Sequence, residues 1–181
     1  MPTTARELNG NLVIDFGDGS EYTIYPVPGK IGIEIQALLV GISLGTTMHE
    51  QGPEAVIENT ERLTKLALGM PDAPAKRRRR APNRAEQAAQ ERFTEFEQMR
   101  GARQQVVAQA AMLWNTGGGG LDAVNDLLDE AGGYPKALGR VMESSGLGAQ
   151  YQVLRTWLGS AENTSATAST PNLTGGPSTS V

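Results

Sequence analysis

The clearest hydrophobic pattern lies near the start of the chain, between Asn11 and Pro26. Apolar and polar side chains alternate in two short runs, 12–16 and 22–26. Alternation with a period of two places successive side chains on opposite faces of a strand. The sequence Gly17-Asp18-Gly19-Ser20 between the runs supplies glycines for a tight reversal. The pattern predicts a β-hairpin that needs a covering element, because a two-stranded ribbon alone is marginally stable in water.

A strongly apolar segment follows the Pro26-Val27-Pro28 elbow and runs from Gly29 or Lys30 to Gly45. Its large apolar side chains recur at spacings of three and four, which is typical of one face of a helix. Ile33, Val40 and Leu44 are expected to widen this face. The length and continuity of the segment favour a helix over a strand. The main members of the face are Ile31, Ile35, Leu38, Leu39 and Ile42.

Further helical patterns continue along the chain. An amphipathic helix is predicted from Pro53 to Gly69, since proline suits a first helical turn and glycine a C-terminal cap. A long helix is predicted from Arg84 to Trp114, with a polar first half that projects and an apolar second half that docks. After the glycine tract 117–120, which we interpret as a hinge, shorter helices are expected around 121–128, 137–142 and 147–158.

Two segments have compositions that argue against a packed structure. The run from Lys76 to Arg80 places like charges side by side between prolines, which predicts an exposed linker over 76–83. Residues 159–181 contain almost no apolar side chains, so burial cannot offset the entropy of ordering them, and we expect disorder. These segments divide the chain into a hairpin with two helices (1–75), the linker, a helical region (84–158) and the tail. The predicted fold class is mainly α with a small N-terminal β-hairpin, an α+β arrangement.

Composition narrows the chemistry. The 181 residues include no cysteine and one histidine, and the net charge is −4. The absence of cysteine excludes disulfides and thiolate catalysis, and no apolar run is long enough to span a membrane. His49 is expected in a loop beside Glu50, with no second ligand type nearby. We therefore expect no enzyme, no catalytic or metal site and no cofactor, and the absence of a secretory signal favours an intracellular protein.

The basic run is the sharpest local signal. Such clusters bind phosphate backbones, but no aromatic side chain is interleaved for stacking on bases. A solvated linker, or an arm for an acidic protein, is therefore favoured over a nucleic-acid site. The stripe Met112-Leu113-Trp114 is expected in the core, although Trp114 beside a glycine tract also suits a partner contact. The basic patch consists of Lys76, Arg77, Arg78, Arg79, Arg80 and Arg84.

The order of these motifs resembles that of a known family. The second strand with its proline (Ser20–Pro26), the helix Ile31–Leu39, the helix end Leu66–Gly69 and the AAMLW sequence at Ala110–Trp114 occur together. They are followed by GGLDAVNDLLDEAGG and a Ser/Thr-rich tail. The arrangement resembles the tail assembly chaperones of long-tailed phages that infect actinobacteria. The arginine run does not belong to that family's pattern.

The resemblance implies a non-enzymatic assembly factor in the host cytoplasm that is absent from the finished virion. Such chaperones bind the long helical tape measure protein, keep it soluble and help tail tube subunits polymerise around it. The family often makes a second, longer product by ribosomal frameshifting, and this product engages the tail tube protein.

The expected contact surface is the first long helix together with the end of the polar one. These residues are Ile31, Ile35, Leu38, Leu39, Ile42, Leu113 and Trp114. The alternative is that they fill the protein's own core. Residual apolar surface predicts self-association. Two rival functions remain: a nucleic-acid-binding protein that uses 76–84, and a structural tail or connector subunit of the virion.

Overall fold

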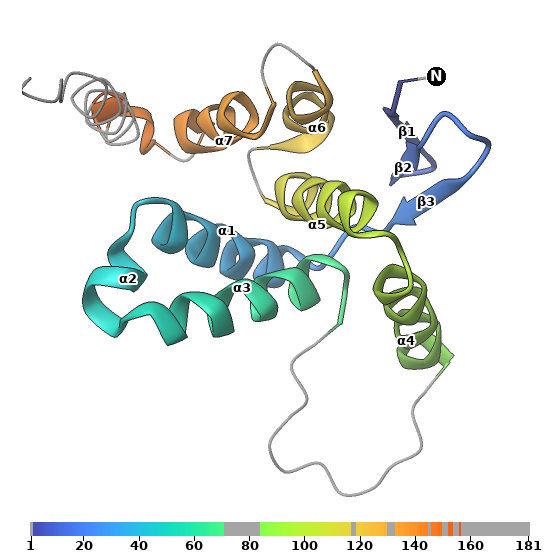
Figure 1. Cartoon of the computed structure of the whole chain (residues 1–181), viewed down its shortest axis with the longest axis horizontal. Helices are drawn as coiled ribbons and strands as arrows, with labels where there is room; N and C mark the ends of the chain where they lie inside the picture. Colours follow the sequence, from blue (N-terminus) through green and yellow to red (C-terminus); the bar gives the residue numbers. More distant parts are fainter. Residues whose placement is uncertain are drawn as a thin grey trace, which may run out of the picture.

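A computed structural model of the chain describes residues 2–70, 84–116, 119–129, 133–144, 146–149, 152–153 and 156. The expected fold class is confirmed, since helices dominate these residues and a small antiparallel sheet stands at the N-terminal end (Figure 1). The elements are, in chain order, β1 (Thr4–Leu8), β2 (Asn11–Asp15), β3 (Glu21–Ile24), α1 (Gly29–Ser43), α2 (Thr46–Gln51), α3 (Pro53–Ala67), α4 (Arg84–Glu97), α5 (Gly101–Asn115), α6 (Gly120–Leu128) and α7 (Gly133–Ser144).

The sheet has the order β1-β2-β3, so the predicted hairpin gains a third strand. In the β2–β3 pair Leu12 lies opposite Ile24 and Ile14 opposite Tyr22. All four side chains are buried on the face that packs against the helices. The strand β1 was not predicted, because its sequence TAREL has no apolar alternation and most of its residues are exposed.

The turn between β2 and β3 is fixed to α5. Arg103 of α5 hydrogen-bonds to Asp18 and to the Ser20 hydroxyl, at 2.8 Å in the second case. Its guanidinium lies 4.7 Å from the centre of the Phe16 ring, within the range of a cation–π contact. Hydrogen bonds from Ser20 and Arg103 hold the pKa of the Asp18 carboxyl well below its usual range. The hairpin is thus anchored at its tip as well as along its buried face.

Helices α1 and α3 lie side by side, linked by α2 (Figure 1). They end near Gly45 and Gly69, whose φ angles of 72° and 78° suit glycine at a helix terminus. An ion pair between Glu34 and Arg62 joins the two helices. The prediction that His49 lies in a loop is wrong, since it is an exposed residue of α2.

The single long helix predicted from 84 to 114 is also wrong. It is broken after Glu97, and α5 begins at Gly101. Arg100 has the extended angles φ −64° and ψ 142°, which interrupt the helical ladder. Both parts contribute to the core, because Phe96 of α4 is buried as well as the C-terminal half of α5.

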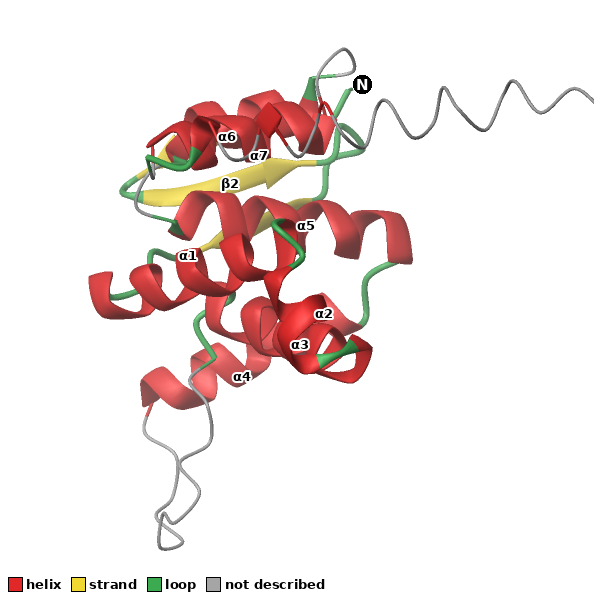
Figure 2. Ribbon diagram, turned by 90° about the vertical axis from the view of Figure 1, so that its left-hand side faces the viewer, coloured by secondary structure: helices red, strands yellow, loops and turns green. Residues whose placement is uncertain are grey.

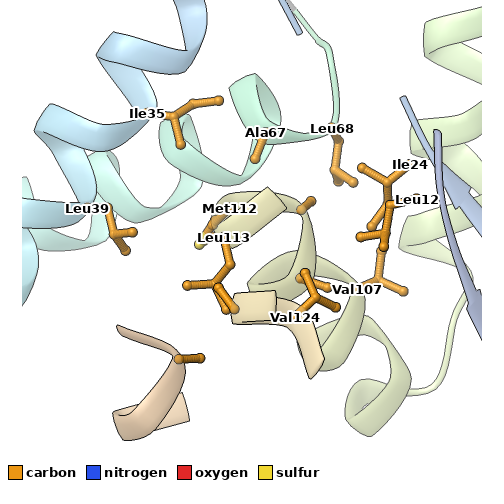
Figure 3. Packing of buried hydrophobic residues seen from close by; sticks show 14 of the residues in the cluster. Leu12, Ile24, Ile35, Leu39, Ala67, Leu68, Val107, Met112, Leu113 and Val124 are labelled. Atoms are coloured by element: carbon orange, nitrogen blue, oxygen red, sulfur yellow. The ribbon is translucent and has the colours of Figure 1, made fainter. Parts of the chain in front are cut away.

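Helix α5 occupies the centre of the molecule. The α6–α7 pair lies on one side of it, α1 and α3 on another, and the sheet on a third (Figures 1 and 2). Figure 3 shows Leu113 surrounded by side chains from these elements, among them Ile35, Leu39 and Val124. The hydrophobic core is therefore one cluster that draws on residues from both sides of segment 71–83.

Several predictions concern residues outside the described part of the chain. These are the linker 76–83, the tail 159–181 and most of the last expected helix, 147–158.

Candidate partner-binding groove

A groove of about 280 Å³ opens where the elbow after β3, the start of α1 and the end of α5 meet. Prolines fix the elbow in an extended course, and two glycines on α1 leave space that side chains would otherwise fill. The groove is lined by Pro26, Val27, Gly29, Gly32, Ile33, Trp114 and Asn115.

Two large apolar side chains are among the lining residues. Trp114 is partly buried and packs against the core from the end of α5. Ile33 stands on α1 with 70% of its surface exposed, the highest exposure of a large apolar residue in α1. The backbones of α1 and α5 approach closely beside the groove, because a Cβ added to Gly32 would lie 2.9 Å from the Asn115 carbonyl oxygen.

The lining of the groove suits apolar binding rather than catalysis. None of the seven lining residues is ionisable, so no general acid, base or charged nucleophile lines the groove. Small-molecule pockets have volumes of roughly 300–1,000 Å³, and a volume of about 280 Å³ lies just below this range. The groove therefore suits one or two anchoring side chains of a protein partner.

The predicted contact residues lie at different depths. Ile35, Leu39 and Leu113 are in the core and present no surface to a partner. Partial burial against the same core is seen for Ile31, Leu38, Ile42 and Trp114. Of the predicted set, Trp114 alone lines the groove.

Sequence reasoning placed Ile33 on the same face as Ile35, which is wrong. Two residues correspond to about 200° around an α-helix with 3.6 residues per turn, so Ile33 points away when Ile35 points inward. This offset was available from the sequence. The elbow residues Pro26 and Val27 gave no comparable signal, because their role depends on the distant Asn115.

The basic patch is represented by Arg84, which is exposed as the first residue of α4. The other members, at 76–80, lie outside the described residues. Their proposed roles therefore stay predictions.

A second hollow, of about 250 Å³, is lined by Asp126 of α6, by residues of α7 and by Gln152. Asp126 accepts a hydrogen bond from Arg140 Nε at 2.7 Å, and its carboxylate lies 2.9 Å from Lys136 Nζ. Hydrogen bonds from Arg140 and then Lys136 lower the pKa of the Asp126 carboxyl. Because the carboxylate of α6 is already paired with two cations of α7, we interpret the cluster as a link between the two helices.

Comparison with protein-family models, with curated proteins and with solved structures found no match for this chain. Among the described residues, no three His, Asp or Glu side chains are grouped so as to hold a metal ion. No helix in the described part of the chain is long and apolar enough to cross a membrane.

Proposed function

We propose that this protein is a non-enzymatic chaperone of phage tail assembly that binds the tape measure protein. The observation that carries the proposal is the groove lined by Trp114, Ile33 and neighbouring residues, which offers apolar anchoring without an ionisable group. The order of sequence motifs, which resembles that of tail assembly chaperones, supports the choice of partner.

The mechanism follows from how amphipathic helices dock. A helix of the tape measure protein carries apolar side chains at spacings of i, i+3, i+4 and i+7, and it would insert one or two of them into the groove against Trp114 and Ile33. Burial of apolar surface stabilises the complex by roughly 25 cal/mol per Å². The partner's helices would thereby be shielded from one another until tail tube subunits polymerise around them.

Two further parts of the proposal follow from the resemblance. A longer frameshifted product would engage the tail tube protein, and both forms would act in the host cytoplasm and be absent from the finished virion. A slippery heptamer near the end of the coding sequence supports the first part, and its absence contradicts it. Mass spectrometry of purified particles checks the second.

The groove can be blocked without disturbing the core. Gly29 lines the groove, and a Cβ added there meets no atom within 4 Å. The substitution Gly29→Leu therefore narrows the groove. A matched control is Gly101→Leu, because Gly101 also opens a helix and has no atom within 4 Å of an added Cβ, but does not line the groove.

The experiment is co-expression of each variant with the candidate tape measure protein, which the proposal expects a neighbouring reading frame to encode. The soluble fraction of that candidate is then measured. We expect wild type and Gly101→Leu to keep it soluble and Gly29→Leu to lose most of this effect. Equal solubility with and without the chaperone contradicts the proposed function. If a folded Gly29→Leu variant keeps the partner as soluble as wild type does, the groove is not the binding site.

A further inference from the structure

The side chain of Asn115 joins three backbone segments at the groove. Its Oδ1 accepts a hydrogen bond from the Val27 N–H at 3.0 Å. Its Nδ2 donates to the Ala67 carbonyl at 2.9 Å and to the Tyr25 carbonyl at 3.4 Å. Asn115 itself is 8% exposed. Its bond to Ala67 is buried, and its bonds to Val27 and Tyr25 are partly buried.

The backbone groups that Asn115 contacts are ones that secondary structure leaves without partners. Val27 lies between Pro26 and Pro28, which have no N–H, so its N–H is the single backbone hydrogen-bond donor of the three elbow residues. Ala67 is the last residue of α3, where carbonyl oxygens lack intrahelical donors. A buried backbone group without a hydrogen bond is strongly unfavourable.

We propose that Asn115 is the positioning residue of the groove: its amide holds the elbow and the end of α3 against the end of α5, and so sets the distance between the elbow and Trp114. The contact of Gly32 with the Asn115 carbonyl oxygen adds α1 to the same assembly. The inference about geometry concerns the protein alone, and only its consequence for partner binding rests on the proposed function.

The chemistry of the side chain explains why an asparagine is needed. An amide carries an acceptor and two donors, which matches one N–H and two carbonyl oxygens. The variant Asn115→Asp keeps the acceptor but at neutral pH turns a carboxylate oxygen toward two carbonyl oxygens. A protonated carboxyl group can donate again, so acid should restore the bond to Ala67.

The first measurement uses the wild-type protein. The bond to Asn115 is the hydrogen bond that the structure gives the Val27 N–H. We expect this amide proton to exchange slowly in NMR, as amides in helices do. Exchange as fast as that of a solvated loop amide overturns the proposal, whether or not any variant folds.

The second measurement uses Trp114 as the reporter. The chain has two tryptophans, Trp114 and Trp157, so Trp157→Phe leaves one emitter. At neutral pH, repulsion between the carboxylate and the carbonyl oxygens of Ala67 and Tyr25 should displace the side chain of Asn115→Asp from the Val27 N–H as well. In this Trp157→Phe background we therefore expect red-shifted emission and fast Val27 exchange. The emission wavelength and the Val27 exchange rate should return toward the values of the parent as the pH is lowered to about 4. A carboxyl in a buried setting protonates at this pH or at a higher one, because burial disfavours its charged form.

Two controls separate positioning from general damage. The Trp157→Phe parent, measured at each pH, corrects for the titration of other carboxyl groups. Asn115→Leu has no titrating group at position 115, so its emission and its Val27 exchange should not recover in acid. Absence of an emission change in Asn115→Asp, or the same acid response in Asn115→Leu, overturns the proposal.

The partner assay distinguishes this inference from the proposed function. With the tape measure protein as ligand, we expect Asn115→Asp to bind about tenfold more weakly at neutral pH, as a lost buried hydrogen bond implies. Undiminished binding by this variant contradicts the role of Asn115. If the exchange and emission results are as expected but wild type does not bind, the proposed function fails and the positioning role stands.

Discussion

At the scale of single residues, Gly32 and Ile33 illustrate what the sequence could and could not predict. The outward direction of Ile33 follows from helical geometry once Ile35 is placed inside. The need for glycine at position 32 does not, because it arises from a carbonyl oxygen of Asn115 that lies far away in the chain. Contacts of this kind depend on tertiary packing, which local patterns do not encode.

The substitution Gly32→Ala tests this contact. In a helix, alanine is usually more stable than glycine by roughly 0.5–1 kcal/mol, but here its Cβ would approach a backbone oxygen at 2.9 Å. We expect the free energy of unfolding to fall by about 1–3 kcal/mol, the usual effect of overpacking. Chemical denaturation measures this free energy of unfolding. The control Gly29→Ala, with no atom within 4 Å, should be neutral or stabilising, and an equal loss in both variants would contradict the explanation.

At the scale of elements, periodicity predicted α1, α3, α6 and α7, but it missed β1, α2 and the break between α4 and α5. The strand β1 and the helix α2 are each only a few residues long and have no apolar period. Their structure therefore depends on the elements they pack against, which are β2 for β1 and α1 and α3 for α2. The break between α4 and α5 was not predicted, because good helix formers surround it. The pair α6 and α7 was predicted from its apolar residues, whereas the ionic link through Asp126 was not.

The substitution Asp126→Asn tests that link. A carboxyl whose pKa is lowered by folding stabilises the protein above its unfolded pKa, near 4, and this contribution disappears as the pH falls through the folded value. At neutral pH we expect the variant to be less stable by about 1 kcal/mol, a modest value because Lys136 and Arg140 are half exposed.

Urea unfolding at several pH values measures this difference, which should shrink below about pH 4. Asp122→Asn is the control, since Asp122 is 79% exposed and 3.9 Å from Arg140. It should change the stability by less than about 0.5 kcal/mol. A loss in Asp126→Asn that is the same at all pH values would argue against the ionic link.

At the scale of the whole molecule, the sequence suggested two helical regions separated by a basic linker, and the structure shows that they share one core. Leu12, Ile35 and Leu66 precede residues 71–83, and Leu113 and Val124 follow them. Composition reveals where a chain is polar, but not whether the segments on either side pack together.

Limited trypsin digestion tests this shared core. The run Lys76–Arg80 offers several cleavage sites. We expect the two resulting fragments to remain associated in size-exclusion chromatography, with the helical circular dichroism of the intact chain, because their buried side chains contact each other. Separation of the fragments in mild denaturant provides the control, and separation in buffer alone would contradict a single core.

The central position of α5 has a consequence during synthesis. When the first three helices leave the ribosome, the side chains of Ile35 and Leu39 still lack Leu113, which is translated only a few seconds later at bacterial elongation rates of roughly 5–20 residues per second. During that interval the apolar side chains of α1 are not yet covered by α5. The core is completed only when α5 has been synthesised and packs against them.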